Sequence, residues 1–200
     1  MNETPALLTR IRKAFRLDRR KSQKGGALDA LLYMVIMGAV LLGILYIFRD
    51  AIFGNRANDA ARDLAQLQSR IQANFYNAST YGTANENLTQ AVINAGLVPT
   101  NQVVGTNIRN RFGGNITINV NATDNSRFDI VYTAVPRSAC SQLVQRTQPG
   151  IYFQVATAPG GGAMTVRGTD NDATNPLPPS LATSGTACNA NTTDIRWTSY

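Results

Sequence analysis

The chain has 200 residues, of which 44% are apolar, 16% are charged and none is histidine. This length suits one domain, or one domain with an appendage. Without histidine the chain cannot carry a Ser-His-Asp or Cys-His catalytic group, a histidine-ligated metal or an imidazole pH switch. Its two cysteines are too few for a four-cysteine zinc site. We therefore expect no catalytic site, no metal site and no cofactor.

The formal net charge of +7 is concentrated in the first residues. Residues 1–24 contain eight Lys or Arg and two acids, a balance of +6, whereas residues 25–200 contain eleven Arg and ten acids, a balance of +1. A face that binds nucleic acid needs clustered positive charge. Because the body of the chain is close to neutral, we expect no nucleic-acid partner.

Residues 27–48 form an apolar run in which Asp29 is the one charged residue. As a helix this run would span about 33 Å, close to the ~30 Å hydrocarbon thickness of a bilayer. Basic residues precede it, so the leader should stay cytoplasmic while the rest of the chain crosses the membrane. A cleaved secretory signal fits poorly, because the run is too long and no clear small-x-small site follows it.

Apolar residues continue at helical spacing beyond the predicted membrane edge. Steps of three and four residues relate Ala57, Ala60, Ala61, Leu64, Leu67, Ile71 and Phe75. This stripe is typical of an amphipathic helix. No proline occurs between Pro5 and Pro99, which predicts a single helix over residues 27–78. Its glycines, Gly38, Gly43 and Gly54, suit either close helix packing in lipid or a place where the helix bends during assembly.

The residues after this helix read as a loop followed by short strands. We predict one short helix within the loop of residues 79–115, at residues 86–95. Two adjacent antiparallel strands follow, at residues 115–121 and 127–134, because apolar and polar residues alternate there.

The last third of the chain continues this pattern. It predicts a helix at residues 136–146, a strand pair at 151–156 and 164–167, a surface loop at 168–190 and an edge strand at 194–200. A helix followed by a run of strands indicates an α+β fold, in which the amphipathic stripe packs on a small antiparallel sheet.

Cys140 and Cys188 both follow the predicted membrane span. If the span is crossed as the charges indicate, both lie in an oxidising compartment, where a disulfide is favoured. Two free thiols are the alternative. A bridge would close a loop of about 49 residues and fix the irregular tail, worth up to ~4 kcal/mol in the chain-entropy model.

The order of these segments resembles a known family. A basic leader ends in Gly25-Gly26, an apolar helix with an early acid follows at once, and two cysteines bracket the C-terminal part. This pattern resembles the type IV prepilins. The body resembles the type IVb class, with its thin-pilus, bundle-forming and toxin-coregulated pilins. The motifs are Leu97-Val98-Pro99, Gly105…Ile108-Arg109-Asn110…Phe112-Gly113-Gly114…Ile116 and Phe128-Asp129-Ile130…Val135-Pro136…Cys140…Leu143.

The resemblance implies a filament subunit and not an enzyme. A prepilin peptidase would remove residues 1–25, leaving an apolar membrane and filament-core helix at 26–56 and a globular domain at 57–200. The new N-terminal amine would be methylated. In this family the cut follows a glycine and the fifth mature residue is Glu. Here Asp29 would be fourth after a cut behind Gly25, which we favour, or third after a cut behind Gly26. Asp29 would then pair with the N-terminal amine of a neighbouring subunit, or serve only to favour the first turn of the helix.

The implied partners are other copies of the chain, the prepilin peptidase, the assembly machinery of the inner membrane, and lipid before assembly. The expected location is the inner membrane of a Gram-negative bacterium and then an extracellular pilus. We expect a major pilin whose filament serves attachment, aggregation or conjugative mating. A minor pilin or tip adhesin is the first alternative. A membrane-anchored periplasmic binding protein or enzyme is the second.

Overall fold

The computed structural model describes residues 26–200, and the leader, with Gly25, lies outside that range. The first element is α2, an α-helix over Gly26–Asn74. It confirms the predicted long helix, which ends four residues earlier than expected. The chain divides into two compact units between Asp50 and Ala51.

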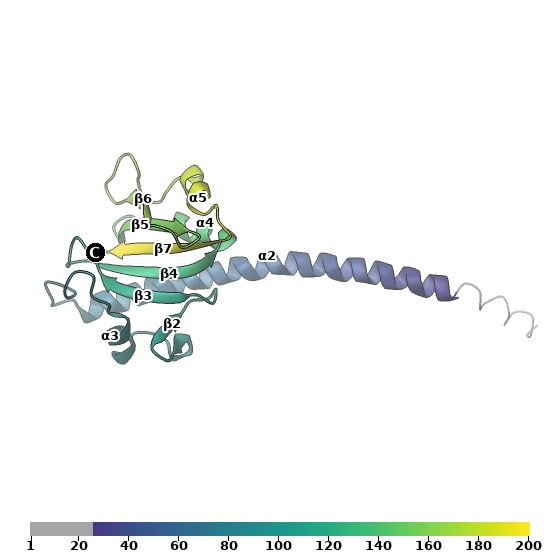
Figure 1. Ribbon diagram of the computed structural model, residues 1–200, viewed down its shortest axis with the longest axis horizontal. Helices are drawn as coiled ribbons and strands as arrows, with labels where there is room; N and C mark the ends of the chain where they lie inside the picture. Colours follow the sequence, from purple (N-terminus) through teal and green to yellow (C-terminus); the bar gives the residue numbers. More distant parts are fainter. Residues whose placement is uncertain (1–25) are drawn as a thin grey trace, which may run out of the picture. The chain divides into compact units, whose positions relative to one another are not determined.

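The second unit contains a seven-stranded antiparallel sheet (Figure 1). Its spatial order is β1-β2-β3-β4-β7-β5-β6. The strands are β1 (Val103–Val104), β2 (Asn107–Arg109), β3 (Asn115–Val120), β4 (Phe128–Pro136), β5 (Tyr152–Pro159), β6 (Thr165–Thr169) and β7 (Thr192–Ser199). The shorter helices are α3 (Thr89–Asn94), the 3₁₀ turn η1 (Thr100–Gln102), α4 (Arg137–Gln145) and α5 (Leu181–Ala187).

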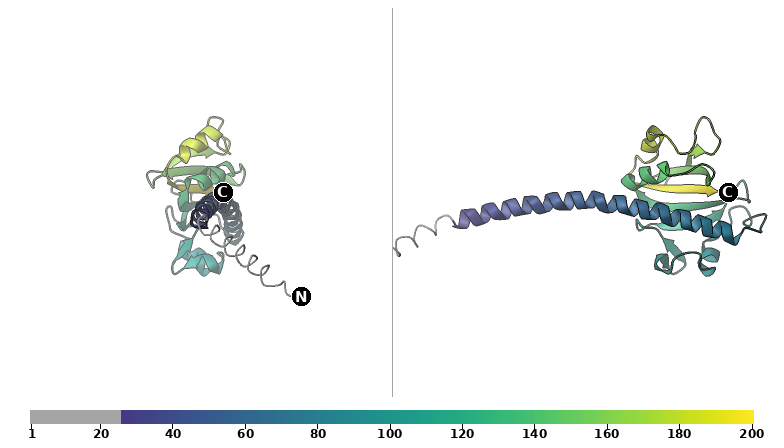
Figure 2. Two further views of the ribbon diagram at one scale, coloured as in Figure 1. Left: turned by 90° about the vertical axis from the view of Figure 1, so that its right-hand side faces the viewer. Right: turned by 180° about the vertical axis from the view of Figure 1, so that it is seen from behind.

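One face of the sheet is apolar because the side chains alternate along each strand. In the central register, Ile118 lies opposite Ile130, which lies opposite Trp197. The second half of α2 lies across this face (Figure 2). Its stripe supplies buried Ala57, Ala60, Leu64, Leu67 and Ile71 to the same core, with Ala61 and Phe75 packed at its edge. The predicted packing of the stripe on the sheet is therefore confirmed.

The opposite face of the sheet is polar. In β4 and β7, Asp129 is paired with Thr198, whose hydroxyl donates a 2.6 Å hydrogen bond to the Asp129 carboxylate. The Asn121 amide donates to the same carboxylate oxygen at 3.0 Å, and Arg196 lies 4.0 Å from the other oxygen. These contacts satisfy a buried acid on the sheet.

Three expectations about the body were wrong. The last strand, β7, is not at an edge but between β4 and β5, because it pairs with both. The 168–190 segment is not only a surface loop, because it forms α5 and buries Leu177 and Ala187. The 79–115 segment contains η1, β1 and β2 besides α3, and these strands extend the sheet beyond β3.

Candidate functional site

The first half of α2 is an apolar surface, whose segment Leu28–Ile47 is not buried by any of the residues that the structure describes. Among the residues described, one helical segment is long and apolar enough to cross a membrane, Leu28–Ile47, with a mean hydropathy of 2.5 and none of its residues buried. A predominantly apolar helix of twenty residues matches the hydrocarbon thickness of a bilayer. Side chains of this kind need an apolar environment, which lipid or other copies of the helix can supply.

Asp29 lies in the first turn of α2 and its side chain is exposed. It is the only charged residue of the apolar segment. An acid in the first turn favours the helix, because the unpaired backbone N–H groups there carry partial positive charge. Gly26 is the first residue of the helix, and Gly25 lies outside the described residues.

Within the second unit, polar side chains tie α2 to the end of the chain. The Gln68 amide donates to the Ser199 hydroxyl at 2.9 Å and to the Ile151 carbonyl at 3.2 Å. One turn on, the Gln72 amide donates to the Tyr200 carbonyl at 2.9 Å. The second half of α2 is therefore fixed to the sheet by hydrogen bonds as well as by apolar packing.

A charged contact fixes α2 to the segment around β1 and β2. Arg111, which follows β2, donates from Nε to Asp63 at 2.6 Å and from a second guanidinium nitrogen at 3.2 Å. This bond raises the pKa of Arg111 above its ordinary value. Gln102 donates to the same carboxylate at 2.8 Å. Fork-like Arg–carboxylate pairing is directional, so it sets where the segment around β1 and β2 lies on α2.

The two cysteines form a disulfide, Cys140–Cys188, with 5.7 Å between their Cα atoms. Cys140 lies in α4 and Cys188 is the C-cap of α5. Both are buried in the core. The bridge fastens α5 to α4, and it confirms the predicted pairing.

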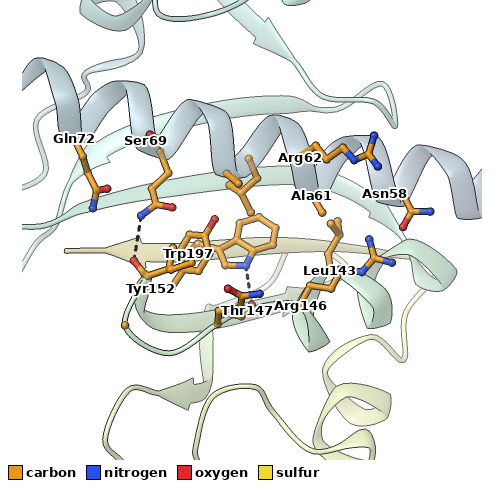
Figure 3. A pocket seen from close by; sticks show the side chains of 16 residues that line it. Asn58, Ala61, Arg62, Ser69, Gln72, Leu143, Arg146, Thr147, Tyr152 and Trp197 are labelled. Carbon is orange, nitrogen blue, oxygen red and sulfur yellow. Dashed lines mark hydrogen bonds between the residues drawn. The ribbon is translucent and has the colours of Figure 1, made fainter.

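A cavity of about 740 Å³ lies between α2, the segment that joins α4 to β5, and β7 (Figure 3). Trp197 and Tyr152 lie at its floor, and the Trp197 indole N–H donates to the Thr147 hydroxyl at 3.0 Å. Burial raises the pKa of the Tyr152 phenol well above its ordinary value, so this group stays protonated. Arg62 and Arg146 lie at one end.

Over residues 26–200, no group of three or more His, Cys, Asp and Glu side chains is placed to hold a metal ion. The features that stand out are the uncovered apolar helix, the body fastened to its second half, and the disulfide.

A family model described as the N-terminal region of PilS matches residues 54–200. This chain belongs to the PilS family of type IV pilins. The crystal structure of TcpA, a type IV pilin from Vibrio cholerae El Tor biotype, is similar in fold, with a TM-score of 0.53 and 16% identity. The match covers 73% of this chain and 99% of the TcpA chain. No curated protein matches the sequence.

As a pilin, the chain is a structural subunit and not an enzyme, as the sequence predicted. The sequence also led to Asp29, Gly26 and the two cysteines. The structure unites the cysteines in one bond, whereas Asp29 and Gly26 lie in the first turn of α2. Sequence reasoning did not single out Arg62 and Arg146, which line one end of the cavity. No local pattern marks them, because they stand on different elements that only the tertiary fold brings together.

Proposed function

We propose that this pilin is the major subunit of a type IVb pilus and polymerises through the first half of α2. The observation that carries the proposal is the uncovered Leu28–Ile47 segment, twenty residues long with none buried. Such a surface is stable in lipid before assembly and against other copies of the same helix afterwards. The body supplies the exterior of the filament. The filament serves attachment, aggregation or conjugative mating.

The proposed route starts in the inner membrane of a Gram-negative bacterium. A prepilin peptidase removes the basic leader behind Gly25 or Gly26, and methylation of the new amine follows. The body, residues 57–200, then lies outside the membrane and residues 26–56 lie within it. The assembly machinery moves the subunit from lipid into the extracellular pilus. The charge distribution supports this orientation, because six of the seven net positive charges precede the apolar run.

Asp29 is proposed to pair with the N-terminal amine of a neighbouring subunit. Its support is its position, as the one charge in an apolar segment and in the first turn of α2. An unpaired amine or carboxylate in a dry filament core would cost several kcal/mol. Pairing the two would remove both costs at once and would favour one docking register.

The test compares three variants in cells: Asp29→Ala, Asp29→Asn and Asp29→Glu. The amount of cleaved subunit in the inner membrane is measured beside the yield of sheared filaments. We expect normal cleavage in all three, few filaments from Asp29→Ala and Asp29→Asn, and more from Asp29→Glu, which keeps the charge. Wild-type filament yield from Asp29→Ala would show that the carboxylate serves only the helix start.

The number of copies in each filament separates a major pilin from a minor pilin or a tip adhesin. Quantitative mass spectrometry of sheared filaments is the measurement. We expect this chain to be the predominant protein, because each copy contributes one core helix. A few copies beside another abundant pilin would assign it the minor role.

A further inference from the structure

The cavity between α2 and the α4–β5 segment has features of a ligand site. Its volume of about 740 Å³ lies within the range of small-molecule sites, which is roughly 300–1,000 Å³. One wall is the second half of α2 and the other follows α4, so the cavity lies wholly within the second unit. Its floor is rigid, because Trp197 and Tyr152 are held in the core.

The cavity carries positive charge that the protein itself does not neutralise. Its lining includes two arginines and no acid. Figure 3 shows Arg62 and Arg146 at the same end. Within residues 26–200 neither guanidinium has a salt bridge or hydrogen bond, whereas Arg111 and Arg196 each face a carboxylate. Two guanidinium groups at one end of a cavity suit a carboxylate, which each can bind with two parallel N–H donors.

The rest of the lining defines the body of the ligand. The lining includes amide and hydroxyl side chains from both walls, Asn58, Gln72, Gln148 and Ser69, and the apolar side chains Leu64 and Ile151. Amides both donate and accept, which suits a ring of hydroxyl groups. The apolar side chains suit the C–H face of the same ring. A lipid tail would cover Asn58, Ser69 and Gln148 without offering them hydrogen bonds, which is costly.

We propose that this cavity binds an acidic sugar, a uronic acid residue of a surface polysaccharide, with its carboxylate between Arg62 and Arg146. The occupied cavity would give the filament a binding site on each copy. This goes beyond the proposed structural role, because assembly does not require it.

The protein supplies its own reporter for the test. Trp197 is the only tryptophan in the chain and lies at the floor of the cavity. Full-length subunit in detergent is titrated with glucuronate, glucose, octanoate and sodium sulfate while tryptophan fluorescence is followed. We expect a saturable change with glucuronate and binding at least about tenfold weaker for glucose, which lacks the carboxylate. Equal responses to glucose, or tighter binding of octanoate or sulfate, would overturn the assignment to an acidic sugar.

Three variants locate the site. Arg62→Gln and Arg146→Gln should each weaken glucuronate binding about tenfold or more, since each removes charge-assisted hydrogen bonds. Arg137→Gln is the matched control, because Arg137 is an exposed arginine at the start of α4 that does not line the cavity. A loss of affinity in Arg137→Gln equal to that in the other two would show general charge attraction and refute the site.

Assembled filaments provide the second measurement. Filaments sheared from cells are sedimented with a fluorescent trigalacturonate, and electron microscopy counts the filaments of each variant. We expect the fluorescent sugar to sediment with wild-type filaments. At equal filament number, much less sugar should sediment with Arg62→Gln filaments. Wild-type filaments that bind none would show that a neighbouring copy closes the cavity, which would overturn the proposal while leaving the proposed assembly intact.

Discussion

The side-chain amide of Gln68 donates a hydrogen bond of 2.9 Å to the hydroxyl of Ser199, 131 positions later in the chain. Gln68 and Ser199 are both buried. The bond therefore joins α2 to the central strand β7 through two buried side chains. Buried polar pairs of this kind are costly to break, because each partner left alone loses its hydration without compensation.

Gln68→Ala should lower the free energy of unfolding by about 2 kcal/mol, since it leaves the Ser199 hydroxyl and the Ile151 carbonyl without this donor. Thermal unfolding of the full-length chain in detergent measures the loss. Gln66→Ala is the control, because Gln66 is exposed on the same helix. Equal stability of the two variants would contradict a structural role for the Gln68 amide.

Removing the disulfide should destabilise the body by up to ~4 kcal/mol in the chain-entropy model. Cys140→Ser and Cys188→Ser should behave alike, and the double variant should resemble either one, because all three lose the same link. Lower pilin abundance in cells should accompany the loss. Alkylation of the native wild-type protein checks the bond itself, and labelling of two thiols would rule it out.

Gly114 lies where a side chain has no room. A Cβ atom at this position would lie 2.0 Å from the backbone carbonyl oxygen of Thr133 on the neighbouring strand β4. Gly114→Ala should therefore cost about 3 kcal/mol of stability, because backbone must move to admit the methyl group. Gly185→Ala in α5 has no atom within 4 Å of the new Cβ and should stabilise by up to about 1 kcal/mol. Chemical denaturation of both variants measures whether the free energy of unfolding falls in the first and rises in the second.

Acid should destabilise the body through its hydrogen-bonded carboxylates. The Tyr200 hydroxyl and the Gly150 N–H donate to Asp170 and hold the pKa of that carboxyl below its ordinary value. A depressed pKa stabilises the fold at pH values above the pKa of the unfolded chain, about 3.9 for Asp. This contribution is lost as the pH falls through the pKa of the folded chain. The pKa values of Glu86, Asp124 and Asp172 are also lowered, each by local hydrogen bonds, so their contributions have the same sign.

Urea midpoints measured from about pH 6 to about pH 2 should therefore fall at the acid end. Tyr200→Phe keeps the ring, which packs against Phe153, but removes the hydroxyl. Its acid-induced loss should be smaller than that of the wild type, because the pKa of Asp170 moves back toward the unfolded value. An unchanged pH profile in Tyr200→Phe would show that this hydroxyl does not stabilise the carboxylate.

Processing should depend on the two glycines between the basic leader and the apolar run. Replacing Gly25 and Gly26 together by bulkier residues should leave an uncut precursor in the membrane and cells without filaments. Mass spectrometry of wild-type filaments should identify the cut behind one of these residues. Filaments that still carry residues 1–24 would contradict removal of the leader.

Local patterns in the sequence were enough to predict several elements. The three- and four-residue spacing from Ala57 to Phe75 predicted the buried face of α2, and alternation predicted the pairing of β3 with β4. These predictions succeed because the periods of 3.6 and 2 residues are properties of neighbouring positions. The position of Cys140 and Cys188 after the predicted membrane span likewise favoured the bond between them, which the structure contains.

Tertiary structure decided the features that depend on distant parts of the chain. Strand β7 is central because its two edges pair with β4 and β5, and no local signal states which strands a strand will meet. The same holds for the cavity, which Arg62 on α2, Arg146 after α4 and Trp197 on β7 line together. The sequence by itself determined the elements with strong periodicity, whereas long-range pairing and side-chain packing determined their order and the sites between them.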